Sequence, residues 1–193
     1  MNAAAARGRI RNIIDNETTA YFSDGELDEF MKMATDEFVQ QYYMAFETTQ
    51  DSRDKLEELV VSEEVNLIDT SSYALSSLTS TYGRFLSAYV KDSPSVNIKV
   101  IQISDITAYL NDPFNKADAS NPVMFFKGGN INTIGFSLTT KVMITYLKYT
   151  TDFEDLSDVT HEEVCQIAAR KVLATLGDPR YQAVQAEITE RRV

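Results

Sequence analysis

The sequence is poor in the residues on which disulfide frameworks and metal centres depend. It contains one cysteine, Cys165, one histidine, His161, and no tryptophan. A single cysteine excludes an internal disulfide, and one Cys with one His is too few for a zinc site. A lone thiol is typical of a protein made in a reducing cytosol. We therefore expect no metal or other cofactor.

Helix breakers and long apolar runs are also scarce. The 193 residues include only 4 prolines and 7 glycines, which argues against disorder. No run of about 18 or more apolar residues occurs, so we expect no membrane span. Residues 1–14 contain arginines but lack the apolar run of a signal peptide. The length and an apolar content of 44% predict one folded domain over residues 1–193.

Charge is distributed unevenly along the chain. Residues 1–14 have a net charge of +3, residues 15–64 of −12, residues 65–151 of +2, and the remainder of −4. A chain this acidic would repel nucleic-acid phosphates. The basic N-terminal residues, Arg7, Arg9 and Arg11, indicate either an arm that docks onto another protein or a surface helix.

Helical periodicity dominates the first part of the chain. Residues 3–14 predict a short amphipathic helix, and Asp51 begins another. Between them, Ser23 with Glu26 forms a capping-box pattern that opens a helix over residues 23–47. The apolar stripe of this helix comprises Leu27, Phe30, Met31, Ala34, Phe38, Tyr42 and Phe46.

The middle of the chain is typical of β-structure. The hydroxyl-rich residues 62–82 predict a loop that leads into a strand, and the period changes near Arg84. Expected strands cover 85–90, 96–103, 123–126, 131–136 and 142–148, with a turn at Ser93-Pro94, a short helix over 105–110 and a hairpin turn at Gly128-Gly129-Asn130.

The last part returns to helical spacing. Thr160 with Glu163 predicts a second capping box, and Gly177 is well placed to end that helix. A final helix is expected over residues 180–190. Residues 1–61 are thus helical, 84–149 mainly β-sheet and 160–190 helical, which predicts a segregated α+β fold with a central antiparallel sheet.

The only histidine and the only cysteine lie four residues apart, on one helical face. The string His161-Glu162-Glu163-Val164-Cys165 resembles a zinc-protease helix but has Cys where the second His is required. We expect His161 in a first helical turn and Cys165 as a small core residue. A reactive Cys–His pair is the alternative.

Acidic and amide residues are too numerous to mark a site. With 29 acids, we interpret pairs such as Asp28-Glu29 as solvated helix faces and expect no catalytic residue. One loop carries oxygen ligands of the type that calcium prefers, but not in EF-hand order, and we predict a plain polar loop. Its residues are Asn111, Asp112, Asn115, Asp118 and Asn121.

Four segments carry a family resemblance through their order and spacing. They read Ser23-Asp24-Gly25-Glu26-Leu27-Asp28-Glu29-Phe30, Leu110-Asn111-Asp112-Pro113-Phe114-Asn115-Lys116, Ile144-Thr145-Tyr146-Leu147-Lys148-Tyr149, and Thr160-His161-Glu162-Glu163-Val164 followed by Asp178-Pro179-Arg180-Tyr181-Gln182. Over most of residues 20–185 the chain resembles the head–tail connector, or neck ring, proteins of crAss-like tailed bacteriophages. The resemblance transfers no catalytic residue.

The resemblance implies a structural virion protein made in the host bacterial cytoplasm. Copies would form a dodecameric ring between the portal protein and other neck and tail proteins, and genomic double-stranded DNA would pass through the ring. Candidate interface residues are Arg7, Arg9, Arg11, Arg180 and Tyr181. Candidate acids of the ring's lumen are Asp28, Glu29, Asp36, Glu37, Glu57 and Glu58. The alternatives are a non-structural phage protein that binds a host partner, and a small Cys/His hydrolase.

Overall fold

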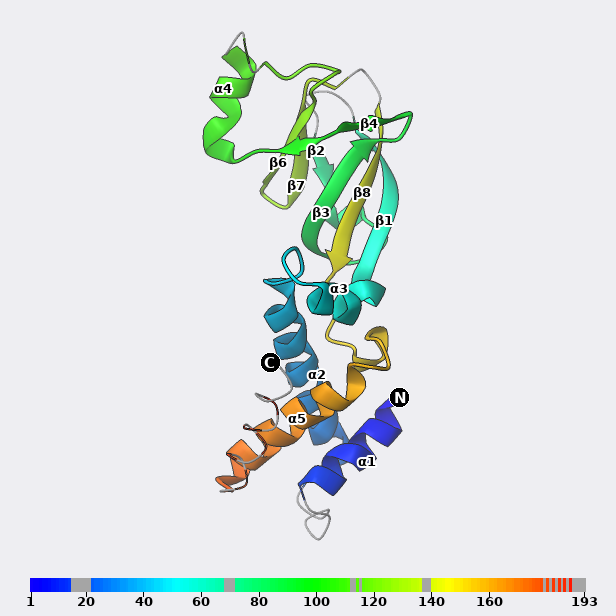
Figure 1. The fold of residues 1–193 in the computed structure, drawn as a ribbon, viewed down its shortest axis with the longest axis vertical. Coiled ribbons are helices and arrows are strands. Elements are labelled where there is room, and N and C mark those ends of the chain that lie inside the picture. Colours follow the sequence, from blue (N-terminus) through cyan, green and yellow to red (C-terminus); the bar gives the residue numbers. More distant parts are fainter. Residues whose placement is uncertain are drawn as a thin grey trace. The chain divides into compact units, whose positions relative to one another are not determined.

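The computed structural model describes residues 1–14, 22–67, 72–111, 114, 116–136 and 140–178, and every second residue from 180 to 188 (Figure 1). For residues 94 and 95 only the backbone is described. The chain divides into two compact units. We call Met1–Leu59 with Thr150–Val193 the helical unit, and Val60–Tyr149 the sandwich unit. Helices at both ends of the chain and antiparallel sheets between them confirm the predicted α+β class.

The helical unit is formed chiefly by α1 (Ala3–Ile13), α2 (Asp24–Tyr43) and α5 (His161–Leu176), with the shorter α3 (Gln50–Leu56), η2 (Glu57–Leu59) and η5 (Phe153–Asp155). α5 packs against both α1 and α2. Its apolar stripe is fully excluded from solvent, and it contributes Val164, Ile167, Ala168, Val172 and Leu173 to the core. The predicted amphipathic helix at the N-terminus is also confirmed, with Ile10 and Ile14 buried.

α2 begins as its sequence predicts. Ser23 Oγ accepts the backbone N–H of Glu26 at 3.3 Å, and the Glu26 carboxylate accepts the N–H of Ser23 at 2.8 Å, which completes the capping box. The helix ends at Tyr43, short of the predicted residue 47. The predicted stripe is buried except at Phe30 and Phe46, which are only half-buried.

The second predicted capping box is wrong. Thr160 stands at the N-cap of α5 with φ −93° and ψ −16°, and its hydroxyl donates to the carbonyl oxygen of Ser157 at 2.7 Å. The helical backbone angles of Thr160 turn its side chain away from the helix, so Glu163 is left to make other contacts. The predicted end is confirmed, because Gly177 adopts φ +67° and closes α5.

The final helix predicted over residues 180–190 lies largely outside the described residues. The described residues 182, 184, 186 and 188 are helical, and the N–H of Val184 donates to the carbonyl oxygen of Arg180 at 3.1 Å.

The sandwich unit holds two four-stranded sheets among the residues described. The first has the order β1-β8-β3-β4 and is antiparallel. The second has the order β2-β7-β6-β5, with only β5 parallel to its neighbour. The strands are β1 (Val60–Leu67), β2 (Ser72–Ala74), β3 (Tyr82–Val90), β4 (Ser93–Asn97), β5 (Lys99–Val100), β6 (Val123–Lys127), β7 (Asn130–Ile134) and β8 (Thr140–Lys148).

The loop predicted over residues 62–82 is wrong, because β1 and β2 lie there and the β-region begins at Val60. β1 pairs with β8 over its whole length. Its inward positions alternate as a strand requires, but Glu63 occupies one of them and masks the pattern. The Glu63 carboxylate accepts the hydroxyl of Tyr146 at 3.1 Å, which satisfies the charge at this inward position.

Three further local predictions can be compared with the structure. The expected turn at Ser93-Pro94 is wrong: the turn is at residues 91–92, and β4 begins at Ser93. The expected strand 96–103 is split into the end of β4, β5 and the 3-10 turn η4 (Ile103–Asp105). The hairpin turn between β6 and β7 is confirmed, with φ of +60° at Gly128 and +75° at Gly129.

The inner faces of the two sheets enclose one apolar core. It joins both sheets through Val65, Leu67, Ala88, Met124, Ile131, Val142, Ile144 and Tyr146. A smaller cluster lies on the other face of the second sheet, around Ile101, Ala117 and Val123. Ile106 and Tyr109 of α4 (Ile106–Asn111) pack against this cluster and hold α4 beside β6 (Figure 1).

Candidate interaction surfaces

The arginines of α1 are bound by acids of the helical unit. Arg7 donates two hydrogen bonds to the Asp28 carboxylate at 2.8 and 3.0 Å. Arg9 makes a bidentate contact with Glu162 of α5, with its Nε 2.9 Å from Oε2. Arg11 contacts Asp24 at 2.5 Å. These pairs attach α1 to the N-terminal turn of α2 and to α5.

Hydrogen bonding is the main cause of the pKa shifts at this contact. The hydrogen bond from Arg11 holds the pKa of Asp24 below its usual value, and the bond to Asp28 raises the pKa of Arg7. The candidate interface arginines therefore stabilise the fold of the helical unit. Their contact with a neighbouring ring stays a prediction.

The candidate lumen acids differ in their partners. Asp28 and Glu29 are in ion pairs, with Arg7 and Lys32 respectively. Asp36 accepts a hydrogen bond from the Gln40 amide at 2.9 Å. Glu57 and Glu58 are exposed and make no ion pair within the described residues.

Glu37 is held by two cations of α5, Arg170 and Lys171, with Lys171 at 2.6 Å. Its partial burial acts to raise the pKa of the carboxyl, but the hydrogen bonds from Lys171 and Arg170 outweigh burial and leave the pKa below its usual value. Glu37 thus joins α2 to α5 and is a poor candidate for a solvent-facing charge.

Of the two C-terminal interface candidates, Arg180 lies among the described residues. Arg180 donates to the carboxylate of Asp178, with its Nε 3.1 Å from Oδ1. Tyr181 lies outside the described residues.

A buried polar network in the helical unit escaped the sequence analysis. Tyr42 donates its hydroxyl hydrogen to Glu163 Oε1 at 2.7 Å, and Lys55 Nζ lies 2.7 Å from the Tyr42 oxygen and 3.2 Å from Glu163 Oε2. The Glu163 side chain is 9% exposed and that of Lys55 is 18% exposed. Burial raises the pKa of Tyr42. A lone lysine beside the apolar Leu56 is the signal that could have indicated this network.

His161 lies in the first turn of α5, as predicted. Its ring stacks on that of Phe153, with centroids 4.1 Å apart. Nε2 must carry the proton that it donates to the Phe153 carbonyl oxygen at 3.1 Å, because a carbonyl can only accept. Nδ1 lies 3.0 Å from the Asp158 carboxylate.

Cys165 is a core residue, as predicted. Its side chain is fully buried, and the thiol donates a weak hydrogen bond to the carbonyl oxygen of Ala6 at 4.0 Å. Burial raises the pKa of the thiol to about 12. A reactive cysteine needs a lowered pKa and solvent access, so the environment of Cys165 is that of an inert thiol.

The described part of the polar loop contains a turn at Asp118. Asp118 Oδ1 accepts the backbone N–H groups of Ser120 and Asn121 at 2.8 and 2.9 Å. Asp112 and Asn115 lie outside the described residues. Within the part of the chain that the structure describes, no cluster of three or more His, Cys, Asp or Glu side chains could hold a metal ion.

Large apolar side chains are exposed around α4. The exposed fractions are 37% for Val100, 51% for Ile103, 47% for Leu110 and 94% for Phe114. Contiguous exposed apolar surface is typical of a protein-binding site, and these side chains are candidates for one. The sequence signal for this exposed apolar surface is Phe114, an aromatic residue within the polar stretch around Asn111.

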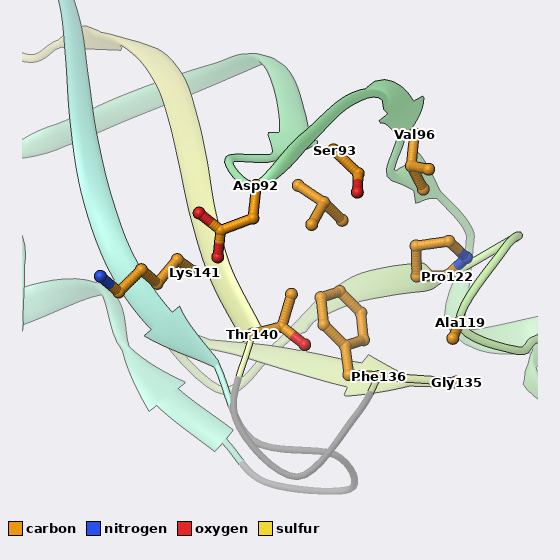
Figure 2. A pocket seen from close by; sticks show the side chains of 10 residues that line it. Asp92, Ser93, Val96, Ala119, Pro122, Gly135, Phe136, Thr140 and Lys141 are labelled. Carbon is orange, nitrogen blue, oxygen red and sulfur yellow. The ribbon is translucent and has the colours of Figure 1, made fainter.

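The sandwich unit also contains an open recess of about 270 Å³ (Figure 2). Val90, Val96, Pro122 and Phe136 form its apolar walls, and Asp92 and Lys141 also line it. Figure 2 shows the Phe136 ring directed into the recess, with Asp92 and Lys141 to one side of it.

A glycine fixes one wall of this recess. Gly135 has φ +83°, and a Cβ there would lie 2.6 Å from the backbone nitrogen of Asp118. Only glycine allows the chain after β7 to approach residues 117–118 this closely, which brings Phe136 and Pro122 to the same recess.

The comparisons with known proteins give no family for this chain. No protein-family model matches it, and no curated protein matches it. Among the described residues, no helix is both long enough and apolar enough to cross a bilayer.

Proposed function

We propose that this protein is a structural subunit of a tailed-phage virion. In this proposal, copies form a dodecameric ring in the neck between the portal protein and the tail, and genomic double-stranded DNA passes through the ring without specific binding. The order and spacing of the four sequence segments support the proposal, as does the confirmed α+β class.

The observation that carries the proposal is the division of charge between the two units. The helical unit has 22 acidic and 11 basic residues, a net charge of −11, whereas the sandwich unit has 7 of each and is neutral. An acidic surface does not retain DNA, since phosphate binding requires Lys and Arg. A neutral unit with exposed apolar side chains suits contacts between proteins.

Ion pairing distinguishes the candidate lumen acids within this proposal. Asp28, Glu29 and Glu37 are paired with cations, so their charges are largely compensated. Glu57 and Glu58 are exposed and without an ion pair in the described residues, and we assign the lumen role to them.

The burial of Cys165 and the hydrogen-bonded ring of His161 weigh against the hydrolase alternative. A nucleophilic thiol would need a nearby base and a path to substrate. The remaining alternative is a non-structural phage protein that binds a host partner through its acidic helices.

Mass spectrometry of purified particles tests the proposal. We expect peptides of this chain in particles at a copy number that matches the portal ring. Detection only in infected cells, with none in finished particles, would refute the virion role and favour the host-binding alternative.

A charge reversal tests the lumen. The double variant Glu57→Lys with Glu58→Lys should slow genome ejection, because each lysine can bind a passing phosphate. Reversal of Asp105, an exposed acid of the sandwich unit, is the matched control and should leave ejection unchanged. Equal ejection by both variants in assembled particles would contradict the assignment.

A further inference from the structure

We infer that a recess in the helical unit binds an aromatic side chain that belongs to a basic segment of another virion protein. We call it the helical-unit recess. It lies between α1, α2 and the start of η5, and its lining includes Ala3, Asp28, Met31, Lys32, Asp152 and Phe153. The inference rests on the proposed function, because it gives the chemistry of a partner for the same subunit.

The size and the apolar part of the helical-unit recess fit one aromatic ring. The recess holds about 340 Å³, and an engineered apolar cavity of about 150 Å³ accepts benzene. Ala3, Met31 and Phe153 supply apolar surface. Met31 and Phe153 are each only 4% exposed, so the recess extends to side chains of the core. A methionine sulfur and an aromatic ring both make favourable contacts with a further ring.

Two of the charged residues that line the recess already have counter-ions. Asp28 lies 2.8 Å from Arg7, and Lys32 lies 2.7 Å from Glu29. Asp152 also lines the recess, is exposed and makes no ion pair within the described residues. The recess therefore keeps a negative charge that is not compensated.

Asp152 and the nearby Glu154 have oxygen atoms left for a cation. Asp152 Oδ1 accepts the backbone N–H of Glu154 at 3.0 Å, and Glu154 Oε1 accepts that of Ala3 at 3.0 Å. The second oxygen of each carboxylate has no partner within the described residues, and both side chains are exposed. A Lys or Arg beside the inserted ring would pair with these oxygens.

Charge favours a different protein over a second copy as the occupant. The helical unit has a net charge of −11, so two such units repel each other, and the arginines of α1 are already paired with acids. The sandwich unit is neutral and offers no excess of cations. A segment rich in Lys and Arg on another protein is attracted to the helical unit.

A short peptide serves as the probe of the recess. The peptide acetyl-Arg-Phe-Arg-amide is titrated into the full-length chain with ¹³C-labelled methionine methyl groups, whose six signals are followed by NMR. We expect the signal of Met31 to shift, while that of Met44, which is 79% exposed and does not line the recess, stays in place. A Met31 signal that does not move would overturn the inference.

Two control peptides separate the roles of the ring and of the charge. Acetyl-Arg-Ala-Arg-amide lacks the ring, and acetyl-Glu-Phe-Glu-amide reverses the charge. Each should bind at least about tenfold more weakly than the probe, because one loses the apolar burial and the other is repelled. Equal affinity for the probe and either control would overturn the inference.

A matched pair of variants tests the space in the recess. Ala3→Leu fills the recess and should weaken binding of the probe at least about tenfold. Ala4→Leu adds the same side chain at the next, exposed position of α1 and should leave binding unchanged. Equal affinities of the two variants would place the probe outside the recess and overturn the inference.

A second pair of variants tests the charge. Asp152→Asn keeps an acceptor for the N–H of Glu154 but removes the charge, and should weaken binding by roughly twofold to fivefold, as for an exposed ion pair. Asp54→Asn changes an exposed acid of the helical unit that does not line the recess, and should have no effect. The same affinity for both variants would contradict the role of Asp152.

Cross-linking in purified particles identifies the partner. A photo-reactive benzophenone side chain in place of Lys32 should cross-link to a Lys- or Arg-rich peptide of a different virion protein, which mass spectrometry identifies. Cross-links to copies of this chain alone, or none to a different virion protein, would overturn the inference.

The peptide titration is separate from the test of the virion role. A chain that binds the probe but is absent from particles would refute the virion role and the virion source of the partner, and would leave the recess as a site for basic aromatic segments. A chain that is present in particles but does not bind the probe would retain the virion role and refute the recess.

Discussion

The buried network of Tyr42, Lys55 and Glu163 permits a direct test of what stabilises the helical unit. We expect Glu163→Gln to remove the charge that Lys55 faces and to weaken two of the hydrogen bonds, while changing little of the volume. Removal of one partner from a buried ion pair costs about 3–5 kcal/mol. Here Lys55 keeps Asp51 at 3.2 Å and is 18% exposed, so we expect a smaller loss, about 2–3 kcal/mol, near the value of a hydrogen bond to a charged group.

The neighbouring residue supplies the control. Glu162 lies next to Glu163 on α5 but pairs with Arg9 at the surface, where the two side chains are 31% and 45% exposed. Glu162→Gln should therefore cost no more than about 1 kcal/mol. Urea unfolding followed by far-ultraviolet circular dichroism measures both values, provided that the denaturant slope is the same in each variant.

A double-mutant cycle shows whether the charge of Lys55 causes the loss. In a Lys55→Met background, Glu163→Gln should cost less than in the natural chain by about 1–2 kcal/mol, because no buried cation is left without its counter-charge. Equal losses for Glu162→Gln and Glu163→Gln, or a coupling near zero, would show that the network contributes nothing beyond packing.

Three further predictions concern other buried or strained positions. Thr35 is fully buried, and its hydroxyl has no hydrogen-bond partner within the described residues, so Thr35→Val should raise the free energy of unfolding by about 1 kcal/mol in a urea titration. Gly135→Ala should lower the free energy of unfolding by more than about 2 kcal/mol, because the residue has a positive φ and the new Cβ would lie 2.6 Å from the backbone nitrogen of Asp118. Gly128→Ala also has a positive φ but meets open space, and should lower it by only about 1 kcal/mol. Equal losses in the two variants would contradict the clash. The pKa of Glu37 is lowered on folding, so the stability that this carboxylate contributes is present above its ordinary pKa of 4.5 and is lost as the pH falls through the lowered value. Glu37→Gln should therefore make the melting temperature depend less on pH in thermal melts from pH 7 downward.

The capping box of α2 and the end of α5 at Gly177 could be predicted because both depend on neighbouring residues alone. The same holds for the hairpin turn at Gly128 and Gly129, where two positive φ values require glycine. Local hydrogen bonds and backbone sterics act over a few residues, so the sequence contains all the information needed.

β1 could not be predicted because its partner lies about eighty residues later in the chain. Glu63 occupies an inward position that becomes acceptable only when Tyr146 and the N–H of Thr79 satisfy its carboxylate. Similarly, the spacing of Thr160 and Glu163 predicts a capping box, but Tyr42 and Lys55 hold Glu163 in the interior. Contacts between distant segments outweigh local preference at these positions.

The candidate interaction surfaces also have some features that follow from the sequence and others that depend on the tertiary structure. The sequence by itself determined the α+β class, the acidic character of the helical segments, the place of His161 in a first helical turn and the place of Cys165 in the core, because periodicity and composition follow from the order of residues. Only the tertiary structure decided which acids are neutralised by cations and that Phe114 is exposed while Phe136 lines a recess. Exposure and charge pairing depend on which distant side chains meet, and that is fixed by packing rather than by neighbours in the chain.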